Sequence, residues 1–267
     1  MKKLILCPAL LFSASVFAHE PYVAPLAYST DNTQIPVISG YAEQALQAEY
    51  ALKDAQFSII PPNQTAYTVQ DLQQLHAMTA FNLKLPESGT YTIYNKTTYP
   101  VQYVQHNKQW KILANATADQ VPPLNERDYV IASDFKGKPT KTVDTIREWS
   151  IQSYLSKTST SDVATTAAPI QVLFQTHPNR IVAQQPVHVQ ILNSGKPFAQ
   201  AELVLRAQGA TEQQAQSIHV ESNGTASLTF PHAGQYLLEV TEKVDPKATP
   251  KNQYYTIISL NVAPASS

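Results

Sequence analysis

One residue of this chain, His19, gains a specific chemistry from its position alone. Upstream, Lys2 and Lys3 precede an apolar run over residues 4–16, and Ala18 stands immediately before His19. This pattern is typical of a secretory signal peptide with a small residue at its cleavage point. Cleavage after Ala18 makes His19 the first residue of the mature chain. Its α-amine and imidazole can then close a chelate ring on a divalent transition metal such as copper or nickel.

The predicted signal peptide, residues 1–18, directs the mature protein to the periplasm. The only cysteine, Cys7, lies inside it, so the mature chain enters an oxidising compartment without a disulfide framework. Loss of Lys2 and Lys3 changes the formal net charge from −1 to −3. So mild a charge offers no basic surface for nucleic acid, and no later apolar run approaches the ~18 residues of a membrane span. We therefore expect no nucleic-acid partner and no transmembrane segment after signal removal.

The composition favours β-structure. The chain has 14 tyrosines and is rich in threonine and valine, residues that are enriched in strands. No long stretch sustains the apolar period of a helix. After loss of the 18-residue signal from the 267-residue chain, 249 residues remain, enough for one large or two smaller domains. The predicted class is mainly β.

A run of serine, threonine and alanine over residues 158–169 is the best linker in the chain. It predicts an N-terminal β-rich domain over 19–157 and a C-terminal domain over 170–267. In the C-terminal part, short strand patterns alternate with turns such as Asn223-Gly224. This spacing indicates an immunoglobulin-like sandwich. The expected fold is thus two β-sandwich (immunoglobulin-like) domains in tandem after a cleaved signal peptide.

Several local patterns make sharper predictions for the N-terminal part. Residues 81–85 alternate apolar and polar, and a Pro/Gly turn leads from them to 90–94, which predicts a hairpin. A second strand pair is expected from 99–103 and 109–113, joined by a polar tip. Residues 43–55 are compatible with either a short helix or an extended loop.

Blocks along most of the mature chain carry a family resemblance. They are HEPYVAP, ISGYAEQALQAEYALKDAQFSIIPPNQ, FNLKLPESGTYTI, VHVQILNSGKPFAQAELVLRAQG and SNGTASLTFPHAGQYLLEV. In this order they resemble the NikM-like family of bacterial periplasmic proteins, a family of unknown function associated with nickel or cobalt uptake. The resemblance implies a metal-handling role and a metal-uptake membrane transporter as partner.

A metal site at His19 requires additional ligands. Pro21 has no amide proton, so chelation along the backbone ends after Glu20. His76 and His106 share the predicted N-terminal domain with His19 and are the candidate partners. No two histidines have the close spacing of a local ligand pair, so the site must be assembled in three dimensions. For the other mature histidines we expect structural or solvent-exposed roles: His177, His188, His219 and His232.

Enzyme motifs are absent from the sequence: it has no nucleophile elbow, no phosphate-binding loop and no HExxH pair. We therefore predict a non-enzymatic periplasmic protein that binds nickel, cobalt or copper through His19, or takes part in uptake of the metal. The alternative is a structural or interaction module that binds a protein or glycan without metal. Copper monooxygenases that attack polysaccharides also begin with a histidine, and the sequence leaves that class open.

Overall fold

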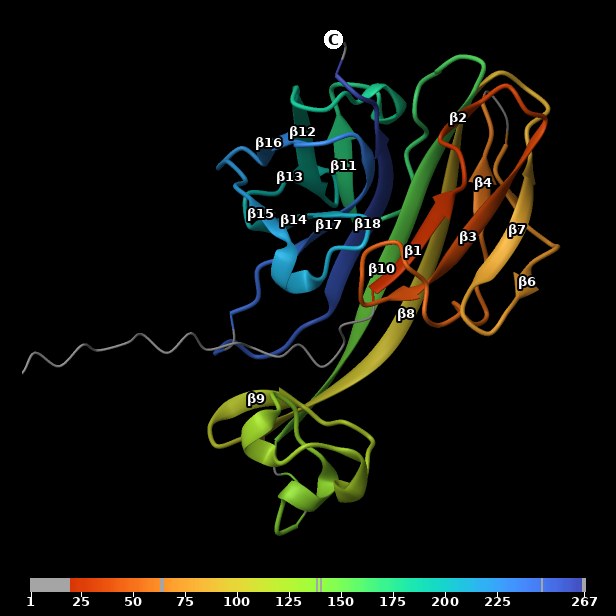
Figure 1. The fold of residues 1–267 in the computed structure, drawn as a ribbon. Helices are drawn as coiled ribbons and strands as arrows, with labels where there is room; N and C mark the ends of the chain where they lie inside the picture. Colours follow the sequence, from red (N-terminus) through yellow and green to blue (C-terminus); the bar gives the residue numbers. More distant parts are fainter. Residues whose placement is uncertain (1–19, 63–64, 138, 140, 246, 266–267) are drawn as a thin grey trace, which may run out of the picture.

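The computed structural model describes residues 20–62, 65–137, 139, 141–245 and 247–265. These residues form strands β1–β18 and five short 3-10 helices, η1–η5, without any α-helix. In this part of the chain no helix is long and apolar enough to cross a membrane. The prediction of a mainly β fold is confirmed. Two sandwiches lie side by side, and a small lobe stands apart from them (Figure 1).

The first sandwich is built from the N-terminal half of the chain. One of its sheets has the order β1 (Glu20–Pro25), β3 (Gln34–Ala42), β7 (Thr79–Lys84) and β6 (Gln73–Gln74). The facing strands are β5 (Tyr67–Thr68), β4 (Ser58–Ile60), β8 (Gly89–His106) and β10 (Thr142–Lys157), with β2 (Ser29–Thr30) paired to the end of β10. Tyr22, Phe57, Leu83 and Tyr91 are among the large side chains that fill its core.

The second sandwich repeats this arrangement. One sheet contains β11 (Ile170–Phe174), β12 (Pro186–Asn193), β13 (Lys196–Pro197) and β16 (Thr225–Thr229). The facing strands are β15 (Gln216–Ile218), β14 (Ala201–Ala207), β17 (Gly234–Glu242) and β18 (Gln253–Val262), with η4 (Pro178–Arg180) and η5 (Glu212–Gln214) in the connections. Each sandwich thus has strands A, B and E in one sheet and C, F and G in the other, the immunoglobulin-like order. The predicted pair of immunoglobulin-like sandwiches is confirmed.

The two sandwiches share one continuous sheet. β10 pairs with β18 in parallel, with Trp149 opposite Tyr255 and Ile151 opposite Ile257. This pairing joins the facing strands of both halves into a ten-stranded sheet. Because successive side chains of a strand point to opposite faces, Ile257 enters the first core and Ile258 enters the second. The two cores therefore lie on opposite faces of the shared sheet.

The same turn begins the central strand of each half. Gly89 and Gly234 have φ angles of +127° and +139°, which glycine adopts without a Cβ penalty. Two residues later, Tyr91 and Tyr236 each donate a hydroxyl hydrogen bond of 2.9 Å to the carbonyl four residues upstream. This is the tyrosine corner of immunoglobulin-like domains. It carries the chain from one sheet to the other.

The corner explains why one local prediction is wrong. Residues 81–85 and 90–94 do not form a hairpin, because β7 pairs with β3 and β6 whereas β8 pairs with β4 and β10. The predicted Pro/Gly turn between them is present, but the hydrogen bond of Tyr91 directs the chain from one sheet of the sandwich to the other. The second predicted pair is confirmed by the antiparallel pairing of β8 with β9 (Gln109–Ile112). Residues 43–55 form turns and extended segments and no helix.

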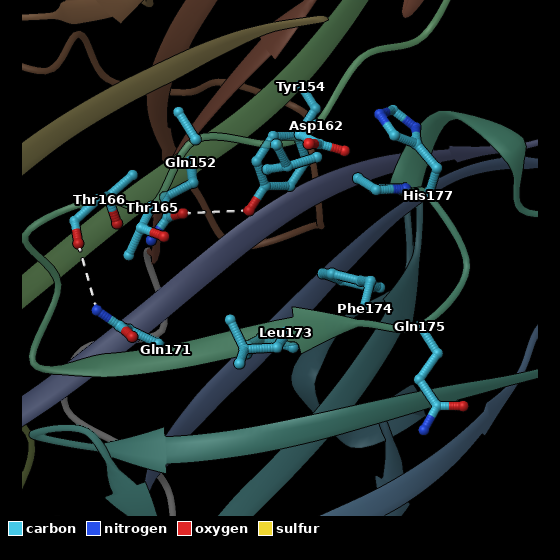
Figure 2. A pocket seen from close by; sticks show the side chains of 14 residues that line it. Gln152, Tyr154, Asp162, Thr165, Thr166, Gln171, Leu173, Phe174, Gln175 and His177 are labelled. Atoms are coloured by element: carbon cyan, nitrogen blue, oxygen red, sulfur yellow. Dashed lines mark hydrogen bonds between the residues drawn. The ribbon is translucent and has the colours of Figure 1, made fainter.

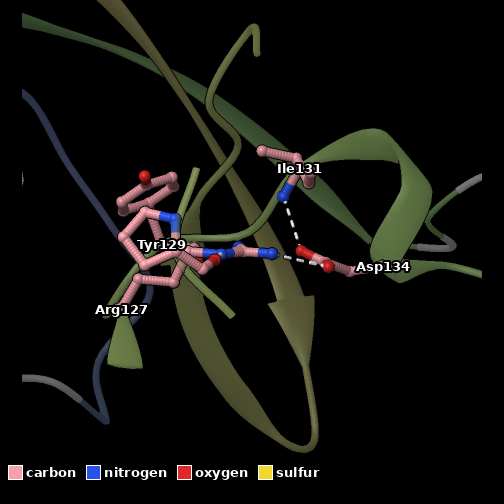
Figure 3. A network of polar contacts seen from close by, with 5 residues as sticks. Arg127, Tyr129, Ile131 and Asp134 are labelled. Carbon is pink, nitrogen blue, oxygen red and sulfur yellow. Dashed lines mark hydrogen bonds and ion pairs between the residues drawn. The ribbon is translucent and has the colours of Figure 1, made fainter. Parts of the chain in front are cut away.

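β8 and β10 continue past the sandwiches as a two-stranded arm that ends in the lobe (Figure 1). The lobe contains β9 and the short helices η1 (Ala118–Gln120), η2 (Leu124–Glu126) and η3 (Ala132–Asp134). At its centre the Arg127 guanidinium pairs with Asp134 at 2.7 Å and donates to the Tyr129 carbonyl at 2.7 Å (Figure 3). Asp134 in turn accepts the Ile131 amide at 2.7 Å. This buried ionic network organises the turns of the lobe.

Candidate functional site

The start of β1 is held between the two sandwiches. Glu20 opens the strand opposite Ala42 of β3, and β1 contacts both β10 and β18 of the shared sheet. The Glu20 carboxylate forms an ion pair with the guanidinium of Arg206 on β14. Arg206 also donates to the Glu43 carbonyl at 3.3 Å. The arginine therefore ties the start of β1 and the end of β3, which lie at the same end of this antiparallel pair, to the second sandwich.

Arg206 brings a positive charge into the protein interior. Its side chain is 2% exposed, against 20% for Glu20. Burial lowers the pKa of Arg206, and the carboxylates of Glu239 and Glu212 oppose this change. Burial also raises the pKa of Glu239, on β17, to about 7, while the Arg206 charge opposes the rise. We call this contact of the start of β1 with Arg206 and its neighbouring carboxylates the seam. It combines one buried cation with carboxylates, one of which, Glu239, changes charge near neutral pH.

The structure places the two described candidate ligands, His76 and His106, apart from each other. His19 lies outside the described residues. His76 is exposed in the turn between β6 and β7, and His106 ends β8 in the lobe, where its ring meets Phe135 edge-on with centroids 5.4 Å apart. Within the described part of the chain, no three His, Cys, Asp or Glu side chains gather closely enough to hold a metal. A ligand set that includes His19 stays a prediction.

A second candidate site is a cavity beside β11, which we call the β11 cavity. It measures about 400 Å³ and lies between β11, residues 162–166 and β10 (Figure 2). The rings of Tyr154 and Phe174 meet edge-to-face along it, with centroids 6.5 Å apart. The polar lining comes from Gln152, Gln171, Gln175, Thr165, Thr166 and Asp162. Among the lining residues, Asp162 is the only one with a formal charge.

His177 closes one end of the β11 cavity. Its Nδ1 accepts the Asn179 amide at 3.1 Å, which assigns the proton to Nε2. Nε2 lies 3.0 Å from both the Ser161 carbonyl and the Thr90 hydroxyl. Burial lowers the pKa of His177, in keeping with a neutral ring. The histidine fastens the segment after β10 to the first sandwich, a structural role.

Neither arrangement follows from sequence spacing. Arg206 and Glu239 come together because β14 and β17 pair in the shared sheet, and Glu20 reaches them from the other end of the chain. The available signal was the presence of charged residues in otherwise apolar strand patterns, at Arg206 and Glu239. The β11 cavity draws its lining from three separate segments, and no motif marks it.

One family model matches most of the chain. A family model described as a domain of unknown function, DUF4198, matches residues 16–243. The chain belongs to the DUF4198 family. The matched region of this DUF4198 protein contains the first sandwich, the lobe and most of the second sandwich. The family description assigns no activity and no link to nickel or cobalt. No curated protein matches the sequence.

Two solved structures illustrate distant matches to the DUF4198 chain. The D0-D1 domain of intimin is 12% identical, with 89% of this chain and 96% of that chain covered and a TM-score of 0.22. A Salmonella alpha-2-macroglobulin reacted with methylamine is 9% identical, with a TM-score of 0.22. That match covers 95% of this chain and 15% of the macroglobulin. Scores this low support no argument about function.

Proposed function

We propose that this DUF4198 protein is a non-enzymatic periplasmic protein that binds nickel, cobalt or copper through the amine and imidazole of a mature His19. The supporting observation is the fixed position of Glu20. Pairing with β3 and the ion pair with Arg206 hold this residue in the seam. Cleavage after Ala18 leaves a single residue ahead of it. The chelating terminus is therefore attached directly to a rigid strand.

The chemistry of the donors limits which groups complete the site. An α-amine has an ordinary pKa of ~7.7–8, so a metal can displace its proton at neutral pH. Imidazole and amine nitrogens suit nickel, cobalt and copper. The Glu20 carboxylate is already paired with Arg206, so it is a poor first ligand. Further donors must come from side chains at the same end of the first sandwich, from water or from a partner.

Of the two predicted partner histidines, His76 is better placed. Glu20 pairs with Ala42, and Ser39 pairs with Thr79 at the start of β7. The β6–β7 turn that carries His76 therefore lies at the same end of the sheet as the start of β1. His106 belongs to the lobe, beyond the arm.

Calorimetric titration of the correctly processed protein with Cu²⁺, Ni²⁺ and Co²⁺ tests the proposal. Mass spectrometry should first verify that the chain begins at His19. We expect one metal per chain and loss of that binding in His19→Ala, because the imidazole that closes the chelate ring with the α-amine is removed. His76→Ala should weaken binding, and His106→Ala is the matched control in the lobe. Unchanged affinity in His19→Ala would refute the His19 site.

Handling of the metal would require its transfer to a membrane transporter that faces the periplasm. Fractionation of cells tests localisation: the protein should be released with the periplasmic contents.

The arm and lobe favour a second candidate function, an interaction module that binds its partner without metal, because they project from the sandwiches (Figure 1). Processed protein that neither contains nor takes up metal would favour this second function.

A further inference from the structure

The first strands of the two sandwiches, β1 and β11, are both edge strands. β1 pairs only with β3, and β11 only with β12. In an antiparallel pair, alternate residues point their N–H and C=O groups away from the partner strand. An edge whose outward groups are free is a template for a further strand, and natural proteins commonly block such edges with proline.

The edge of β1 is blocked. The Leu26 amide donates to a β3 carbonyl. The backbone N–H and C=O groups of the even-numbered β1 residues therefore point toward β3. The outward positions are therefore Pro21, Val23 and Pro25, and the two prolines have no N–H to offer. The Val23 carbonyl accepts the hydroxyl of Ser259 from the shared sheet. Little of this edge can pair with another strand.

The edge of β11 is open over its second half. The Gln175 amide donates to a β12 carbonyl. The backbone N–H and C=O groups of Ile170, Val172 and Phe174 therefore point away from β12. The Ile170 carbonyl accepts the Thr256 hydroxyl at 2.6 Å, as Val23 does in the other half. Among the described residues, the backbone groups of Val172 and Phe174 have no hydrogen-bond partner. No proline blocks them.

The β11 cavity lies along this open edge (Figure 2). Its volume of about 400 Å³ falls within the ~300–1,000 Å³ of typical ligand sites. Tyr154 and Phe174 offer apolar contact, and glutamine side chains offer hydrogen bonds. Asp162 is exposed at the rim and is the charged group of the lining. The cavity therefore combines unpaired backbone, mixed side-chain contacts and one negative charge.

We propose that β11 binds an extended peptide segment of a partner protein, which adds to its open edge as a further strand. The peptide backbone would pair with Val172 and Phe174, the arrangement of β-strand addition. Its side chains are uncharged or basic, because Asp162 attracts a cation and repels a carboxylate. This surface lies on the second core's face of the shared sheet and is independent of the proposed metal site.

Three capped hexapeptides of alternating threonine and valine, with Lys, Gln or Glu at one central position, serve as probes. Backbone amide exchange of the mature protein is followed by NMR during titration with each peptide. We expect the Lys peptide to bind about tenfold more tightly than the Glu peptide, with the Gln peptide between them. The amides of Val172 and Phe174 should become protected from exchange, and that of Val23 should not.

Two variants test the geometry and the charge separately. Val172→Pro copies the prolines of β1, removes one outward N–H and leaves the β11–β12 pairs intact, so affinity for all three peptides should fall about tenfold or more. Asp162→Asn should abolish the difference between the Lys and Glu peptides and leave the Gln peptide unchanged. If circular dichroism shows that Val172→Pro does not fold, the peptide affinities of Asp162→Asn and the amide protection in the wild type test the proposal. Absence of protection at Val172 and Phe174, or a Lys preference that survives Asp162→Asn, would overturn the proposal.

Discussion

The two sandwiches share their strand order and tyrosine corner but differ where strands meet solvent. In the first, β8 and β10 have 18 and 16 residues and extend into the arm. In the second, the corresponding β17 and β18 have 9 and 10 residues and end with the sandwich. The first strand is blocked by prolines in one half and open in the other. The two sandwiches are thus alike in their cores and tyrosine corners, and they differ in the lengths of their strands and in the edges of their first strands.

The faces of the shared sheet differ in the same way. The face of the first core holds an ionic group, Arg206 with Glu20 and Glu239, beneath the start of β1. The face of the second core holds the neutral pair Gln152 and Tyr154, beside a cavity. In the first half β1 closes over the sheet. In the second half the cavity separates β11 from β10. The first strand thus lies against the shared sheet in one half and is separated from it by a cavity in the other, although the two halves share their strand order.

The largest difference between the halves should come from their corner glycines. Gly89→Ala and Gly234→Ala both force a side chain into a positive φ, at about 1–3 kcal/mol each. At Gly89 the new Cβ would also lie 2.7 Å from Pro62 Cγ and 2.9 Å from Ser161 Oγ, whereas at Gly234 no atom lies within 4 Å. We expect losses of about 4 and about 2 kcal/mol in urea unfolding. Equal losses would show that the Pro62 contact relaxes freely.

The next largest effect should come from the link between the halves. Arg206→Met keeps the apolar stem and removes the charge that pairs with Glu20. Breaking a buried pair costs about 3–5 kcal/mol, and Glu20 is one-fifth exposed, so we expect about 3 kcal/mol. Thermal unfolding measures the loss, with Arg180→Met as the control at an exposed arginine. A loss as small as that of the control would mean that the seam does not depend on this ion pair.

Sequence patterns predicted the class, the tandem sandwiches and most strands, because alternation and turn residues are local signals. The turn at Gly89 shows their limit. A Pro/Gly turn between two strands resembles a hairpin, and only the hydrogen bond of Tyr91 across the corner reveals the change of sheet. The parallel pairing of β10 with β18 and the burial of Arg206 depend on residues far apart in the chain. No local pattern could place them, and His19 stays a prediction of sequence alone.

A smaller effect should distinguish the two corners themselves. The Tyr91 hydroxyl donates one hydrogen bond of 2.9 Å and accepts another of 2.9 Å, whereas the bond that Tyr236 accepts is longer, at 3.3 Å. Tyr91→Phe should therefore cost about 1–2 kcal/mol and Tyr236→Phe about 1 kcal/mol. Urea unfolding of both variants gives the comparison. A larger loss for Tyr236→Phe would place the more important corner in the second half.

The smallest effect should be a change in how steeply the free energy of unfolding depends on pH, and it should come from Glu239 at the seam. A carboxyl with a higher pKa in the folded than in the unfolded protein binds more protons when folded, so Glu239 lowers stability as pH rises from ~4.3 toward about 7. The charges that face it are Arg206, Glu202 and Glu212. Glu239→Gln removes the titrating group and should gain stability relative to the wild type over this range, with Glu221→Gln as the control at an exposed carboxylate that is not among these charges.

If the free energy of unfolding changes with pH equally in the wild type and in Glu239→Gln, Arg206 keeps Glu239 ionised over this whole pH range. The ionic face would then be a fixed charge cluster, as unresponsive to neutral pH as the uncharged Gln152–Tyr154 face opposite. Diverging slopes would instead assign pH sensitivity to one half of a repeated fold. In either case the difference arises from where the halves meet, because the tyrosine corners and cores of the two sandwiches are built alike.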